Sequence, residues 1–240
     1  MNLQFETIAV VHSPYKEKFG VPRQPSLVPQ ARGSVELLPP YSCAEAVAGL
    51  EGYSHIWIQF LFDRSLRQRW QPTVRPPRLG GNRRVGVFAS RSPFRPNPIG
   101  LSVVRLERVI ADTGGVVLEI SGLDLVDGTP VLDIKPYVAY ADSVPGAVSG
   151  FADAAPGPVF EVRFSARARN QLAERSNGGE ISEMIRALLA TDPRPAYIKQ
   201  GRRQRVYGIR LYDFDLRWRV AGEVAEVLEL ARPDYFSAER

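Results

Sequence analysis

Four segments of the chain carry polar and charged side chains that plain packing does not require, three of them among prolines and glycines and one at the end of an apolar strand. They cover residues 13–24, 55–64, 79–102 and 124–137. Prolines hold the first segment extended, so that Arg23 and Gln24 are presented rigidly. In the third, three prolines in six positions exclude a helix or a central strand and leave a rigid loop that carries Arg91, Arg95 and Asn97. Since guanidinium groups bind carboxylate and phosphate oxygens bidentately, these loops predict an anionic ligand.

The distribution of charge points to a polyanion. The net charge is +5, and no acidic residue lies between Asp63 and Glu107, a stretch that holds ten arginines. A second acid-free stretch, residues 193–212, carries six basic side chains. Solvated surfaces normally mix the two signs, so single-sign stretches of this length favour a nucleic acid as partner. For residues 202–205 taken alone, a merely solvated basic loop remains an alternative.

Several common kinds of catalytic site are missing. No two glycines are spaced i, i+2, so the chain has neither the G-x-G of a dinucleotide fold nor a phosphate-binding P-loop. One cysteine and two histidines, without an H-E-x-x-H motif, predict no metal site and allow no internal disulfide. The nucleophile elbow G-x-S-x-G is absent as well. An enzyme with this sequence is expected to work without a metal and without a Rossmann sheet.

Apolar residues alternate with a period of two along most of the chain, which predicts a mainly β protein. The expected strands are 3–12, 33–38, 53–62, 84–90, 101–110, 115–121 and 131–138, with a hairpin turn at 112–115. A short helix over 43–50 is expected to be capped by Ser42, with Cys43 packed among small residues. Strands that follow one another without long helices indicate an antiparallel barrel.

The second half of the chain reads as a smaller α+β unit. We expect a barrel domain over residues 1–145, a linker over 146–158 and the α+β domain over 159–240. In the latter, helices are predicted at 166–175, capped by Ser165, and at 181–190, with strands at 159–164, 206–211, 214–220 and 224–230. The chain opens without a signal peptide and has no membrane-length apolar run, so a cytoplasmic location is expected.

Two strings within these segments, SRSPFRPNPIGLS and DLVDGTPVLDIKPY, closely resemble the tRNA adenine-N6-methyltransferase family, also called the TsaA or TrmO family. The resemblance is strongest over the first 145 residues and extends to DPRPAY and DFDLRW near the C-terminus. It implies a β-barrel methyltransferase that acts as a homodimer with S-adenosylmethionine as the methyl donor. The implied acceptor is N6 of threonylcarbamoyl-adenosine, next to the anticodon of a tRNA.

The resemblance also implies which residues contact the cofactor. Carried over position by position, they are Pro22, Arg23, Gln24, Asp63, Arg64, Arg91, Leu101, Asp127, Gly128, Thr129 and Pro130. An arginine suits the carboxylate of S-adenosylmethionine, and Leu101 suits its adenine. At 63–64, where many relatives have a histidine followed by another polar residue, contacts through the backbone are the alternative.

The acceptor nitrogen must lose a proton, and Asp133, Lys135 and Tyr137 are the candidates for this catalytic role. Each has a structural alternative. Asp133 and Lys135 share one face of a strand, where they would pair with each other, and Tyr137 would be an ordinary barrel tyrosine. His55, Trp57 and Phe60 are expected in the core.

The predicted RNA contacts are Arg95, Arg194, Lys199, Arg202, Arg203 and Arg205, with the last five gripping the anticodon arm. Two rival functions remain open on the sequence. The first is a non-catalytic RNA-binding barrel, in which tyrosines 197, 207 and 212 and Trp218 stack on bases. The second is a small-molecule methyltransferase with an incidental basic surface.

Overall fold

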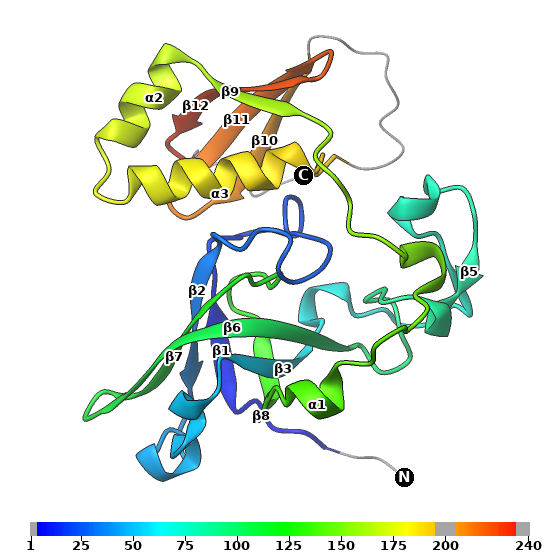
Figure 1. Ribbon diagram of the computed structural model, residues 1–240, viewed down its shortest axis with the longest axis vertical. Helices are drawn as coiled ribbons and strands as arrows, with labels where there is room; N and C mark the ends of the chain where they lie inside the picture. Colours follow the sequence, from blue (N-terminus) through cyan, green and yellow to red (C-terminus); the bar gives the residue numbers. More distant parts are fainter. Residues whose placement is uncertain (1–3, 195–204, 234–240) are drawn as a thin grey trace.

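A computed structural model describes residues 4–194 and 205–233, which form two stacked units (Figure 1). The lower unit is a closed barrel with the strand order β1-β2-β7-β6-β3-β8. Its strands are β1 (Ala9–His12), β2 (Arg32–Leu37), β3 (His55–Leu61), β6 (Ile99–Asp112), β7 (Gly115–Ser121) and β8 (Pro130–Pro136). Every neighbouring pair is antiparallel, and β1 closes the ring by pairing with both β2 and β8. The expected mainly β barrel is thus confirmed.

Alternation along the strands fills the barrel. In β7 the inward side chains are Val116, Leu118 and Ile120, all buried, while the side chains between them are partly exposed. Burying aliphatic side chains of this size contributes about 1.5–3 kcal/mol each. The predicted hairpin also forms, since Asp112 pairs with Gly115. The Asp112 carboxylate accepts a hydrogen bond from the Gly114 N–H at 2.7 Å, which fixes the turn.

The expected helix over 43–50 is wrong. The segment forms two 3₁₀ turns, Ala44–Val47 and Leu50–Gly52, without a side-chain cap. Ser42 cannot cap a helix because its hydroxyl accepts the N–H of Val116, in β7, at 2.8 Å. Cys43 is exposed rather than packed.

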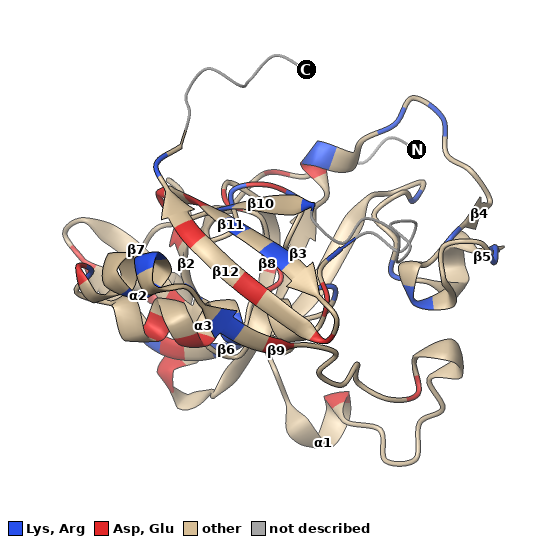
Figure 2. Ribbon diagram, turned by 90° about the horizontal axis from the view of Figure 1, so that it is seen from above, with Lys and Arg blue, Asp and Glu red and all other residues tan. Residues whose placement is uncertain are grey.

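The strand predicted over 84–90 is also wrong for most of its length. Only Val85–Gly86 (β5) is extended, and it pairs with Thr73–Val74 (β4) rather than with the barrel. Six other strands already close the barrel, so this segment has no free edge to join. The chain instead folds into an excursion over residues 66–98, between β3 and β6, which we call the flap. The flap projects from the side of the barrel (Figures 1 and 2).

The upper unit has the predicted α+β character. Its sheet has the order β10-β11-β12-β9, with β9 parallel to β12. The strands are β9 (Glu161–Phe164), β10 (Val206–Leu211), β11 (Phe214–Ala221) and β12 (Val224–Ala231), and the helices are α2 (Ala166–Ala173) and α3 (Gly178–Ala190). Ser165 caps α2 as predicted, since its hydroxyl accepts the Ala168 N–H at 3.0 Å. A short helix, α1 (Ala139–Asp142), leaves the barrel.

The two units meet where residues 14–20 pass under the upper sheet. Tyr15 forms a β-bridge with Leu211, and the Tyr212 N–H donates to the Pro14 carbonyl at 2.8 Å. The Tyr15 side chain is fully buried at this junction. The segment that leaves β1 is therefore held by both units.

We expect Gly100→Ala to destabilise the barrel. A Cβ at position 100 would lie 2.2 Å from the ring of Phe60, which is itself buried. Overpacking of this kind costs about 1–3 kcal/mol, measurable as a lower melting temperature. Gly208→Ala is the matched control, because a Cβ there meets no atom within 4 Å. Equal melting temperatures for the two variants would contradict the prediction.

Candidate functional site

Asp127 connects three loops at one end of the barrel. One carboxylate oxygen accepts the Ser13 N–H at 2.8 Å, and the other pairs with Lys16 Nζ at 2.8 Å. The Asp127 N–H donates in turn to the Tyr15 carbonyl. Burial disfavours the charged carboxylate, but the bonds from Lys16 and Ser13 outweigh it, so the pKa of Asp127 is lowered. Asp127 thereby fixes residues 13–16 against the turn that leads into β8.

Arg64 completes this connection from the third loop. Its guanidinium donates to the carbonyls of Lys16 at 3.1 Å and Asp127 at 2.7 Å. Its own carbonyl accepts from Lys18 Nζ at 2.6 Å. Next to it, Gly128 is exposed and has a φ of +79°, a conformation that favours glycine. Arg64 thus serves in the protein as a clamp between loops.

A second group of polar side chains lies beside the first. The Arg91 guanidinium donates to Gln24 Oε1 at 2.8 Å, which ties the flap to the loop that leaves β1. The Ser26 N–H donates to the Gly122 carbonyl at 2.8 Å, so the same loop also borders residues 122–124. There, Ser102 Oγ donates to Asp124 Oδ1 at 2.6 Å. Arg91, Gln24 and Asp124 therefore meet from three separate loops.

Asp124 is the titratable group that the sequence analysis missed. Burial raises its pKa to about 6, although the bond from Ser102, its backbone and the charge of Arg91 act in the opposite direction. A carboxyl that titrates near neutrality beside an exposed arginine is a candidate acid–base group. In the sequence Asp124 lies between Leu123 and Leu125, a pattern that indicates a core segment rather than a site, and both leucines are indeed fully buried. The only sequence feature that could have indicated Asp124 is its position three residues before Asp127, a predicted cofactor contact.

On the outer face of the barrel, Leu101, Gln59 and Asp133 lie in one row across β6, β3 and β8. Leu101 is 49% exposed, which is unusual for leucine on a strand. Asp133 pairs with Lys135 Nζ at 2.6 Å, so the two residues form the ion pair that was the alternative to a catalytic role. Tyr137 lies nearby, with its ring centroid 5.9 Å from that of Trp57. Trp57 and His55 are only half-buried, so the expectation of a core role fails for both, whereas Phe60 is buried as expected.

The remaining predicted contacts are held by other partners. The Arg23 guanidinium donates to the Arg194 carbonyl at 3.2 Å. The Thr129 hydroxyl is buried and donates to the Val126 carbonyl, and Pro130 pairs with Val10 in the barrel. Pro22 and Asp63 are half-buried in their loops.

Among the described residues, the predicted RNA contacts lie in two places, Arg95 in the flap and Arg194 and Arg205 beside the ring of Tyr207. Arg95 donates to the carbonyls of Val87 and Ser90, which gives it a structural role in the flap. Arg194 is paired with Asp192 at 2.7 Å, and Arg205 is exposed beside the ring of Tyr207. Lys199, Arg202 and Arg203 lie outside the described residues, as does Tyr197. Trp218 is fully buried and Tyr207 nearly so, so neither ring is free to stack on a base.

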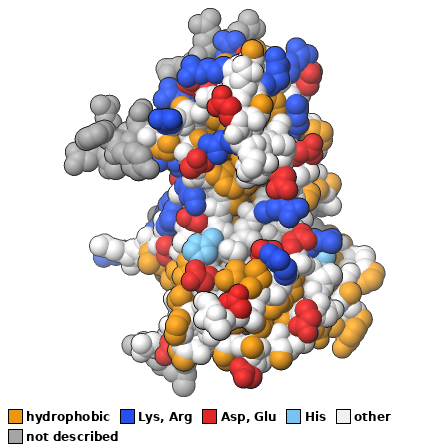
Figure 3. All heavy atoms as spheres, turned by 90° about the vertical axis from the view of Figure 1, so that its left-hand side faces the viewer, with side chains coloured by type: hydrophobic (Ala, Val, Ile, Leu, Met, Phe, Trp, Pro, Cys, Tyr) orange, Lys and Arg blue, Asp and Glu red, His pale blue; other side chains and the backbone are white. Residues whose placement is uncertain are grey.

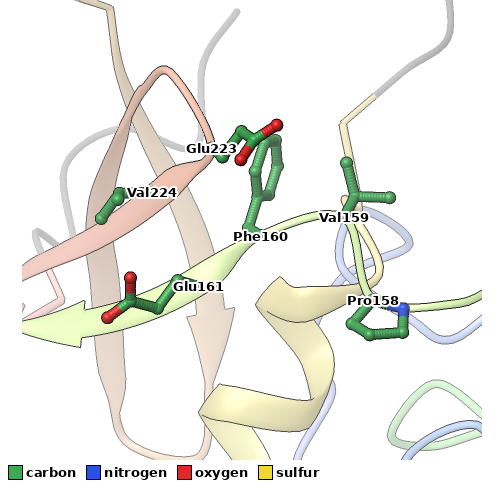
Figure 4. Close-up of a pocket in the computed structure, with 6 residues that line it drawn as sticks. All are labelled: Pro158, Val159, Phe160, Glu161, Glu223 and Val224. Atoms are coloured by element: carbon green, nitrogen blue, oxygen red, sulfur yellow. The ribbon is translucent and has the colours of Figure 1, made fainter.

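A surface depression lies on the upper unit, where β9 begins (Figure 4). It is lined by Pro158, Val159, Phe160, Glu161, Glu223 and Val224. Two glutamates among apolar side chains do not suit a phosphate or a carboxylate, and none of the predicted contacts lines it. Within the described ranges, no group of three or more His, Cys, Asp or Glu could hold a metal ion. Nor is any described helix long and apolar enough to span a membrane.

Comparison with known protein families decides the relationship. Residues 10–143 match the tRNA-methyltransferase O N-terminal domain, and residues 158–233 match the TrmO C-terminal domain. The chain belongs to the TrmO family. Its strand order and the loops at the barrel's end are therefore those of a TrmO protein.

Relatives and solved structures agree with this assignment over nearly the whole chain. The tRNA (adenine(37)-N6)-methyltransferase of Escherichia coli is 50% identical over 95% of this chain and 98% of its own length. A Pseudomonas aeruginosa protein named as a putative S-adenosylmethionine-dependent methyltransferase is also 50% identical, over 95% of this chain and 97% of its own. The crystal structure of TrmO from P. aeruginosa superposes with a TM-score of 0.81 at 42% identity, covering 96% of this chain and 99% of that one.

We expect Asp124→Asn to change how stability depends on pH. Because the folded-state pKa of Asp124 is raised to about 6 from the ordinary 3.8, ionising it costs stability as pH rises between these values. The variant, which Ser102 can still hydrogen-bond, escapes this loss. Relative to the native protein, it should gain on the order of 3 kcal/mol in unfolding free energy between pH 4 and pH 7. Denaturant unfolding at several pH values measures this, and parallel curves would contradict it.

Proposed function

We propose that this TrmO protein transfers a methyl group from S-adenosylmethionine to N6 of a threonylcarbamoyl-modified adenosine next to the anticodon of tRNA. The main support is that predicted cofactor contacts from separate loops, Gln24, Arg64, Arg91 and Asp127, come together at one end of the barrel. Relatives named as methyltransferases favour catalysis over a non-catalytic RNA-binding barrel. The name of the E. coli relative favours tRNA over a small-molecule acceptor.

Side chains at this end of the barrel, and Leu101 on its outer face near the start of β6, suit the cofactor. S-adenosylmethionine supplies an electrophilic methyl group when it is bound. The exposed Arg91 matches its carboxylate, the exposed Leu101 matches its adenine, and Gly128 allows close approach of the backbone. The side chains of Asp127 and Arg64 already have hydrogen-bond partners in neighbouring loops. We therefore propose that they shape the site and that the backbone groups of these residues contact the cofactor.

The chain contributes mainly by positioning the acceptor nitrogen and by taking its proton. As the new N–C bond forms, this nitrogen must release its hydrogen to a base, because it would otherwise carry a positive charge. Asp133, Lys135 and Tyr137 remain candidates, but Asp133 and Lys135 already pair with each other at 2.6 Å. We propose Asp124 instead, since it lies beside Arg91 and titrates near neutrality.

Two further assignments are proposed, the first supported by the acid-free run of basic residues at 193–212 and the second by the resemblance alone. We propose that the C-terminal unit contacts the anticodon arm through Arg194, Lys199, Arg202, Arg203 and Arg205. We also propose that the protein is a homodimer.

The activity is tested directly by mass spectrometry. The protein is incubated with isotope-labelled S-adenosylmethionine and tRNA that carries the threonylcarbamoyl group, and the RNA is digested to nucleosides. We expect one labelled methyl group on the modified adenosine and loss of most transfer with Arg91→Ala. Arg108→Ala is the matched control, an exposed arginine that pairs with Glu119 on the hairpin. Absence of label with bound tRNA would contradict the proposal.

The base is tested by comparing two aspartates. We expect Asp124→Asn to lower kcat by about 10²–10⁴-fold and to abolish the rise in rate as pH passes about 6. Asp133→Asn, in the outer row, should keep both the rate and its pH profile. Should the losses fall on Asp133→Asn instead, the original candidate would be the base and Asp124 a structural group.

A further inference from the structure

The flap presents aromatic rings to solvent. Trp70 is 51% exposed and Phe88 is 73% exposed, far more than the rings that pack the two units. The two rings are stacked, with centroids 6.5 Å apart and planes inclined by 30°. We call this pair of exposed rings the platform.

The platform is held firmly from within the flap. The Arg95 guanidinium lies 5.7 Å from the Phe88 ring and donates to the carbonyls of Val87 and Ser90, which flank that residue closely. The Val87 N–H donates to the Pro72 carbonyl at 2.9 Å, which connects the two sides of the flap. The rings are therefore already positioned before any partner binds, which lowers the entropic cost of binding.

Positive charge surrounds the platform. Residues 66–98 contain eight arginines and no acidic residue. Arg78 and Arg84 have partners, but Arg69, Arg75 and Arg83 have no ion-pair or hydrogen-bond partner among the described residues. Figure 2 shows blue without red along β4, β5 and their loops, whereas the face in Figure 3 mixes both colours. The flap is thus the part of the described surface where unpaired positive charge and exposed rings occur together.

We propose that the flap binds unpaired nucleotides of the RNA substrate, whose bases stack on Trp70 and Phe88 and whose phosphates contact the surrounding arginines. Aromatic platforms in a basic groove recognise single-stranded nucleic acid because each unpaired base has a free face. A duplex offers no such face. A second copy of this flap would bring arginines against arginines, so the charge favours a polyanion over self-association. Naming the RNA as tRNA rests on the proposed function.

The test is a binding measurement with matched variants. The affinity of the full-length protein for a tRNA anticodon stem–loop is measured by fluorescence anisotropy at several salt concentrations. We expect Trp70→Ala and Phe88→Ala each to weaken binding by about tenfold, with an unchanged salt slope, and Trp70→Phe to recover most of the loss. Arg69→Ala should instead reduce the salt slope. Tyr140→Ala is the control, since this ring is 93% exposed on α1, outside the flap.

Mass in solution and methyl transfer are measured on the same variants. Unchanged affinity in both ring variants would overturn the inference. A smaller assembly with Trp70→Ala would also overturn it, because the flap would then be an interface between copies. Methyl transfer at saturating tRNA should be retained. If the flap variants lose RNA affinity but the native protein transfers no methyl group, the inference stands and the proposed function fails.

Discussion

The ion pair and hydrogen bonds of Asp127 hold this protein's candidate site together. One carboxylate fixes the loop that leaves β1, and Arg64 binds the carbonyl of the same residue from the end of β3. Charge-assisted bonds are the stronger kind, and here they join loops that share no strand pairing. Without the Asp127 carboxylate, the segment that presents Gln24 to Arg91 would lose this link to the turn before β8 but would keep its contacts with the upper unit and with Gly122. The barrel is a scaffold for this end, and one carboxylate joins two of its loops.

Much of the fold could be predicted because its signals are local. Alternation revealed six barrel strands, and Asp112 with Gly115 marked the hairpin. The errors arose where tertiary contacts decided the outcome. The Ser42 hydroxyl accepts a hydrogen bond from β7 and so does not cap a helix. Residues 84–90 cannot pair with the barrel because six other strands already close it. Neither outcome can be read from a period or a propensity, because each depends on which partner is free.

The site was predictable in part, and for a different reason. The resemblance implied Gln24 and Arg91 as cofactor contacts, and the two side chains are hydrogen-bonded to each other. Asp124 was overlooked because leucines flank it and because a raised pKa follows from burial, which the sequence does not record. Charge counts located the basic flap but could not show that the Arg95 guanidinium binds backbone carbonyls. Residue types predict which chemistry is available, whereas partners decide which groups are free to perform it.

The bridge between Tyr15 and Leu211 makes the loop after β1 part of the contact between the two units. Under the proposed function, a donor that restrains this loop would also restrain the junction, and an RNA bound to the upper unit would act on the same residues from the other side. Such coupling is reciprocal, because the free energy of the doubly bound state is independent of the order of binding. If the methyl donor changes the affinity for RNA by some factor, RNA changes the affinity for the donor by the same factor. Under the proposed function, the junction would thus couple the two ligands, whether each strengthens or weakens binding of the other.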